Sequence, residues 1–72
     1  MKTYHVRYHL FQYSEEEGID VLANNKEEAY DYAVYELIPN NDGHIPYSAW
    51  VESVTYSNGN YHTFNTSEGN AY

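Results

Sequence analysis

The sequence contains no cysteine, and this absence removes two supports that small domains often use. Without thiols the chain has neither a disulfide framework nor a thiolate metal site. A chain of 72 residues has room for one small domain, and such a chain buries only about 60% of the surface that its unfolded form exposes. We therefore expect its stability to depend on a tight aromatic core or on self-association.

Basic side chains are also scarce. Lys2, Arg7 and Lys26 stand against 11 acidic residues, which gives a formal net charge of −8 at pH 7. Nucleic-acid binding needs several cation–phosphate contacts at once, so we expect no direct binding of DNA or RNA. An anionic membrane surface would repel the chain for the same reason. The partner that this charge favours is a basic surface on another protein.

The chain also lacks long apolar runs and the short motifs of common enzymes. No apolar stretch approaches the roughly 20 residues that span a bilayer, and no leader-like segment opens the sequence, so we expect a cytoplasmic location. The glycines are isolated and no serine lies in a Gly-x-Ser-x-Gly context, so we predict no phosphate-binding loop, no cofactor and no catalytic residue. The expected protein is not an enzyme.

The four histidines do not form a metal-ligand pattern. His5 and His9 share a strand face but stand about 13 Å apart along it, too far to hold one ion. We expect the histidines to form cross-strand polar pairs or to lie in solvated loops, and we predict no metal site.

What the sequence has in abundance is tyrosine, ten residues in all, much of it in alternating segments. Residues 2–13 alternate with a period of two, which predicts a half-buried strand. Residues 14–18 hold three glutamates and a glycine and predict a solvated turn. Residues 19–23 predict a second strand that forms an antiparallel hairpin with the first.

A helix follows, with a clear start and a predicted end. Asn24 or Asn25 is the expected N-cap, and Glu28 stands three residues after Asn25 as in a capping box. Pro39 should end the helix near Ile38.

The last predicted elements form a second hairpin. Residues 47–56 predict a strand, and Asn58-Gly59 predicts a two-residue type I′ turn that sets Tyr56 opposite Tyr61. One α+β domain over residues 1–66 results, with the order β-β-α-β-β, one helix on a four-stranded antiparallel sheet and a frayed tail at 67–72. One helix covers one sheet face, so the other face stays open.

Two surfaces are candidates for partner binding. The first joins acids and tyrosines, which suits arginine-rich sites because carboxylates pair with guanidinium groups and aromatic rings stack on them. Its members are Glu15, Glu16, Glu17, Asp20, Glu28, Asp31, Tyr32 and Tyr35. The second is an aromatic sheet face, for docking on a partner or for a homodimer. Its members are Trp50, Val54, Tyr56 and Tyr61. The bland alternatives are solvated acids and single exposed tyrosines on a sheet.

Two segments carry a resemblance to a known class of proteins. Tyr4-His5-Val6-Arg7-Tyr8, followed by the segment from Val21 to Ala29, resembles the β-β-α start of small accessory proteins of phages and mobile elements. In size, acidity and tyrosine content the chain is similar to anti-CRISPR proteins. The likeness rests on size, charge and element order, so it transfers no individual residue.

The resemblance implies a stoichiometric inhibitor that binds a Cas protein or complex where DNA or its PAM would bind, in the host cytoplasm if the chain is phage-encoded. We thus expect a non-enzymatic DNA mimic that binds a basic protein surface. The alternative is a small homodimeric interaction module acting through the aromatic sheet face. A third hypothesis, a small enzyme or metal protein using His62 with a carboxylate, has the least support from the sequence.

Overall fold

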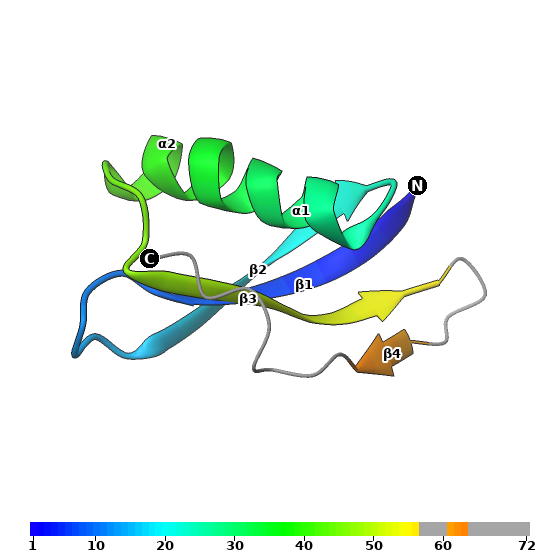
Figure 1. The fold of residues 1–72 in the computed structure, drawn as a ribbon, viewed down its shortest axis with the longest axis horizontal. Helices are drawn as coiled ribbons and strands as arrows, with labels where there is room; N and C mark the ends of the chain where they lie inside the picture. Colours follow the sequence, from blue (N-terminus) through cyan, green and yellow to red (C-terminus); the bar gives the residue numbers. More distant parts are fainter. Residues whose placement is uncertain (57–60, 64–72) are drawn as a thin grey trace.

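One helix lies across one face of a four-stranded antiparallel sheet (Figure 1). The structure is a computed structural model, and it describes residues 1–56 and 61–63. The strands are β1 (Lys2–His9), β2 (Glu16–Ala23), β3 (Ser48–Thr55) and β4 (Tyr61–Thr63). The helix winds through α1 (Lys26–Tyr32), a π-helical turn η1 (Ala33–Leu37) and α2 (Ile38–Asp42). The α+β class and the β-β-α-β-β order predicted from the sequence are confirmed.

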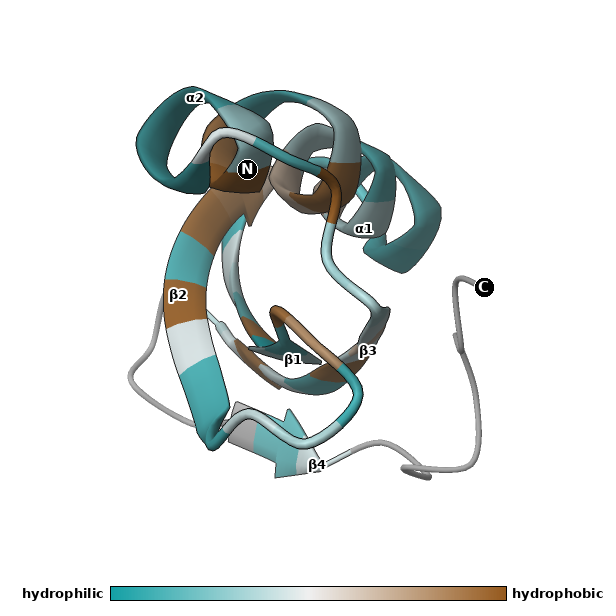
Figure 2. Ribbon diagram, turned by 90° about the vertical axis from the view of Figure 1, so that its left-hand side faces the viewer, coloured by the Kyte–Doolittle hydropathy of each residue, from teal (hydrophilic) through white to brown (hydrophobic). Residues whose placement is uncertain are grey.

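The sheet has the order β2-β1-β3-β4, so β1 is central and β2 lies at one edge. Alternation along β1 decides which side chains enter the core: Tyr4, Val6 and Tyr8 are buried against the helix, while the residues between them are half-buried on the other face. Figure 2 shows the two layers end-on, with the helix over the concave side of the sheet. The helix adds small residues, Ala29 and Ala33, whose size lets it approach the strands closely.

The first hairpin differs from its prediction at both strand ends. β1 stops at His9 rather than at Tyr13, because Ser14 closes a turn: its Oγ accepts from the Phe11 N–H at 2.9 Å, and its own N–H donates to the Phe11 carbonyl. β2 begins at Glu16 rather than Ile19, so Gly18 is a strand residue and not a turn residue. The glutamates that indicated a turn are tolerated in a strand because they lie at a solvated sheet edge.

The helix begins where the sequence predicts and ends later. The Asn25 side chain accepts from the Glu28 N–H at 2.8 Å, which confirms the cap. The predicted stop at Pro39 is wrong. In the wider π turn the Ile38 N–H bonds to Ala33 five residues back, and the chain then continues through Pro39, whose ring needs no N–H partner in the new first turn. The helix ends at Gly43, which takes a left-handed conformation with φ 86°.

A β-bulge in β3 changes which residues share a face. Val51 pairs with Val6 and Ser53 pairs with His5, so Glu52 is an extra residue between them. Val51 and Val54 are therefore both buried on the helix side. Pairing of β3 with β4 is shifted by one residue from the prediction, since Thr55 rather than Tyr56 lies opposite Tyr61. The predicted Asn58-Gly59 turn and the predicted tail at 67–72 lie outside the described residues.

Candidate functional site

The outward side of the helix gathers four of the predicted site residues. Glu28, Asp31, Tyr32 and Tyr35 line one broad, shallow depression, together with Glu36. The helical repeat of 3.6 residues places these positions on neighbouring turns of one face, as the sequence predicts. Both tyrosines are about half exposed, at 48% and 50%, so their rings are available to a partner.

A second depression adjoins the first along the seam between the helix and β2. Its lining is mostly apolar, with acidic residues beside it: Met1, Asp20, Val21, Leu22, Glu28, Tyr32 and Leu37. Glu28 and Tyr32 line both depressions, so the two form one continuous surface. Leu22 and Met1 are exposed there, which places an apolar centre beside carboxylates. An apolar centre with a polar rim is the usual construction of a protein-binding surface.

We call this surface the acidic face and define it by Glu28, Asp31, Tyr32, Tyr35 and Glu36. Neither depression is lined by lysine or arginine. Four of the eight predicted acidic-surface residues are thus brought together by the fold. Asp20 lines the seam depression, but its carboxylate lies against His5 on the other face of the sheet. Sequence reasoning missed Glu36 and the apolar side chains of the seam, because contact between the helix and β2 is long-range and leaves no local pattern.

The other three predicted residues lie elsewhere. Glu15 is exposed in the loop before β2. Glu16 faces away from the helix and forms an ion pair with Arg7. Glu17 pairs with Tyr8 in the sheet and so belongs to the helix side of the strand. The three consecutive glutamates therefore point in different directions, because side chains alternate along an extended strand.

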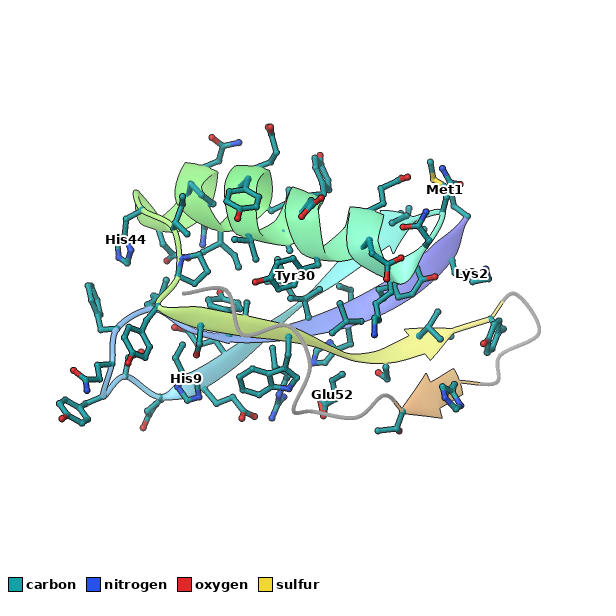
Figure 3. All side chains as sticks on the ribbon, in the orientation of Figure 1. Met1, Lys2, His9, Tyr30, His44 and Glu52 are labelled. Carbon is teal, nitrogen blue, oxygen red and sulfur yellow. The ribbon has the colours of Figure 1, made fainter. Side chains whose placement is uncertain are left out.

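The sheet face opposite the helix carries a network of cross-strand polar contacts, which includes the ion pairs of Arg7. His5 Nδ1 lies 2.7 Å from Asp20 Oδ1, and His5 Nε2 lies 3.9 Å from Glu52 Oε1. Arg7 Nε lies 3.3 Å from the same Glu52 oxygen. The cross-strand pairing expected for the histidines is confirmed for His5. Figure 3 shows His9 and Glu52 on this face, away from the helix.

Gly18 makes room for this network. A Cβ atom at Gly18 would lie 2.6 Å from His5 Nε2, well inside van der Waals contact. The imidazole therefore rests over the backbone of β2, in the space that a side chain would fill. This position lets one ring face carboxylates on both flanking strands.

The predicted aromatic face is not one surface. Trp50 lies on the open side of the sheet, with its ring centroid 5.7 Å from that of His9, while Val54 is in the core. The prediction that these two share a face is wrong, because the bulge at Glu52 shifts the alternation between them. Tyr56 is exposed just after β3, and the side chain of Tyr61 lies outside what the structure describes.

Tyr4, Tyr8 and Tyr30 have raised pKa values, chiefly because they are buried. Burial raises the pKa of Tyr30 to about 12, helped by the neighbouring Tyr35 and Asp31. Burial is also the main reason that the pKa values of Tyr4 and Tyr8 are raised. Figure 3 shows Tyr30 between the helix and the sheet. These rings hold the two layers together and are separate from the acidic face.

Within residues 1–56 and 61–63, no three His, Asp or Glu side chains come together as ligands for a metal ion. In the same part of the chain, no helix has the length and apolar character that crossing a bilayer requires. Comparison of the chain with protein-family models, curated proteins and solved structures gave no match.

Proposed function

We propose that this protein is a non-enzymatic inhibitor of the anti-CRISPR type, which occupies a basic DNA-binding site on a Cas protein or complex as a DNA mimic. The observation that carries the proposal is the acidic face: carboxylates and half-exposed tyrosines line two adjoining depressions that hold no basic side chain. The net charge of −8 adds long-range attraction to a basic groove. The target class comes from the resemblance in size, charge and element order.

The spacing of the acidic groups supports imitation of a phosphate backbone. Glu28 and Asp31 are one helical turn apart, roughly 5 Å along the axis. Phosphates along one DNA strand are separated by a similar order of distance, about 3.4 Å of axis each. Carboxylates at this spacing pair with successive arginines or lysines of a groove, while Tyr32 and Tyr35 offer rings on which a guanidinium stacks.

The shape of the acidic face supports binding to a groove rather than enclosure of a small molecule. The depression on the helix is broad and open, and the helix lies on the outside of the sheet (Figure 1). An acidic helix in this exposed position fits into a concave basic channel. Leu22 and Tyr32, exposed at the seam, add apolar area that strengthens a complex beyond charge attraction alone.

Binding to purified Cas effector complexes, measured at low and high salt and in competition with their DNA, tests the proposal. We expect one effector to bind the protein, DNA to compete, and affinity to fall steeply with salt because exposed charges are screened over about 10 Å at 0.1 M. Replacing Glu28 with Gln and Asp31 with Asn should weaken binding by about tenfold or more.

A matched control removes the same charge elsewhere. The double variant Glu15→Gln, Glu27→Gln neutralises two exposed acids that line neither depression, one of them in the same first helical turn as Glu28. It should bind almost as the unchanged protein does. Equal losses for both double variants would mean that net charge alone acts, and affinity indifferent to salt and to DNA would refute mimicry.

A further inference from the structure

A third hollow lies at the opposite end of the helix–β2 seam and is smaller and more apolar than the acidic face. It has a volume of about 230 Å³ and is lined by Tyr8, Ile19, Leu37, Ile38, Asn41 and Asp42. Small-molecule sites usually measure about 300–1,000 Å³, so this hollow suits a single side chain better than a cofactor. Leu37 also lines the seam depression of the acidic face, so the two are neighbours.

Asp42, which lines the hollow, has a carboxylate oxygen without a hydrogen-bond partner. Two side-chain polar atoms in the described part of the chain are buried without a hydrogen bond, Arg7 Nε and Asp42 Oδ2. The Glu52 carboxylate lies beside Arg7 Nε. Asp42 Oδ2 accepts no hydrogen bond from any other described residue. A buried oxygen in this state costs free energy until a donor reaches it, more so when the group is charged.

Two further sources of negative charge, the end of helix α2 and Glu17, indicate that the missing hydrogen-bond donor is a cation. Asp42 is the last residue of α2, where backbone carbonyls give the helix end a partial negative charge, and the last turn holds no basic residue. Glu17 and Asp42 both lie close enough to Tyr8 to add to the rise in its pKa. The hollow therefore combines apolar walls with a concentration of negative charge that the described residues do not neutralise.

We propose that this hollow binds the side chain of a lysine from the partner protein, with the alkyl chain against Ile19, Leu37 and Ile38 and the ammonium group on the Asp42 carboxylate. Lysine places a compact charge at the end of a flexible apolar chain, which matches an apolar hollow with one carboxylate in its lining. Arginine fits less well, because its planar fork favours two carboxylate oxygens together. That the lysine belongs to a basic protein rests on the proposed function, whereas the ligand chemistry rests on the hollow itself.

Nuclear magnetic resonance with a small probe tests the site without the partner. Nα-acetyl-lysine-methylamide is titrated into the isotope-labelled protein, with the norleucine and arginine analogues as controls. We expect shift changes centred on Ile19, Leu37 and Asp42, with a weak dissociation constant on the order of 1 mM for a single side chain. The norleucine analogue, which keeps the alkyl chain but lacks the charge, and the arginine analogue should both bind more weakly.

Two variants remove one negative charge each. Asp42→Asn should weaken lysine binding about tenfold, whereas Asp31→Asn, on the acidic face, should leave it unchanged. Thermal melting confirms that both variants fold, and we expect Asp42→Asn to be at least as stable because it removes the buried charge. Unchanged binding by Asp42→Asn, equal binding of norleucine, or shifts centred on the acidic face would overturn the proposal.

The outcome separates this site from the proposed function. Lysine binding that depends on Asp42 while no Cas effector binds would reject the target and keep the site. An effector that binds and competes with DNA equally well in the Asp42→Asn variant, together with no probe binding, would keep the function and reject the site.

Discussion

At the scale of single residues, the contact between Gly18 and His5 shows how a missing side chain supports a network of cross-strand polar contacts. The imidazole occupies the space that a Cβ atom at position 18 would need. Because of this, His5 lies between Asp20 and Glu52, which belong to the two strands flanking β1. Glycine in a strand normally lowers stability, by roughly 0.5–1 kcal/mol relative to alanine. Here that cost is offset by the contacts of the His5 imidazole, which fits in this position because Gly18 has no side chain.

A double-mutant cycle tests this role. Gly18→Ala alone should destabilise the protein, because the new methyl group displaces the imidazole and breaks its contact with Asp20, worth about 1 kcal/mol. In the His5→Ala background the same substitution should instead stabilise by about 0.5 kcal/mol, since the clash is gone and the backbone of the unfolded chain is restricted. Urea unfolding measures both values. If Gly18→Ala changed the free energy of unfolding in the same direction in both backgrounds, this role of Gly18 would be contradicted.

Because of Tyr30, the free energy of unfolding depends on pH in the alkaline range. Its folded-state pKa of about 12 exceeds the usual value of 10.0, so the folded protein keeps this phenol protonated where the unfolded chain loses the proton. The unfolded state then binds fewer protons, so the free energy of unfolding falls as pH rises from about 10 to 12. The contribution of Tyr30 to the free energy of unfolding is complete below about pH 10, and it is lost as the pH rises through about 12.

A tyrosinate absorbance titration checks this prediction. Tyr30→Phe should reduce the late, high-pH part of the titration and lessen the fall in melting temperature over the same range. Tyr32→Phe, which removes a hydroxyl group from the exposed side of the same helix, is the matched control. If the high-pH part of the titration kept its full amplitude in Tyr30→Phe, that part would belong to other residues.

At the scale of elements, the bulge in β3 decides which residues are core. Val54 is 2% exposed because Glu52 is an extra residue in the strand, while Ser53 beside it is half-buried. Val54→Ala should lower the free energy of unfolding by about 2 kcal/mol, from lost methyl burial and the cavity left behind. Ser53→Ala should change it by no more than about 0.5 kcal/mol. Denaturant unfolding compares them, and the reverse order would contradict the bulge.

The sequence predicts features that depend on local chemistry and misses those that depend on distant packing. The helix start follows from Asn25 and Glu28, and the central strand follows from alternation. The helix end does not, because a π turn relieves the geometry that would otherwise stop the chain at Pro39. The bulge is equally hidden, since Glu52 breaks the period by one residue without any glycine or proline to mark it.

The residues of the candidate site are likewise predictable where they follow a local pattern and hidden where they depend on distant packing. Glu28, Asp31, Tyr32 and Tyr35 were found together because helical periodicity is visible in the sequence. Asp20 and Glu16 do not join them, because cross-strand contacts hold Asp20 against His5 and Glu16 against Arg7 on the other face of the sheet. The valine predicted for the aromatic face belongs to the core instead.

At the scale of the whole molecule, charge is distributed unequally between the two sides. On the open sheet face, Arg7 and His5 lie against the carboxylates of Asp20, Glu16 and Glu52. On the helix side, no lysine or arginine lines the depressions of the acidic face. We therefore expect attraction of a basic partner to be strongest over the helix. A basic partner should approach from that side, with the open sheet face turned away.

The position of β2 at the sheet edge has a consequence for self-assembly. An edge strand offers backbone groups to which another strand can add, and charged side chains are a common protection against this. Glu16, Glu17 and Asp20 belong to β2 and supply that protection. Glu17→Val should therefore raise amyloid-specific dye fluorescence, whereas Glu17→Lys, which keeps a charge at this position, should leave it low. The acids of the edge strand thus keep the free protein from assembling into fibrils.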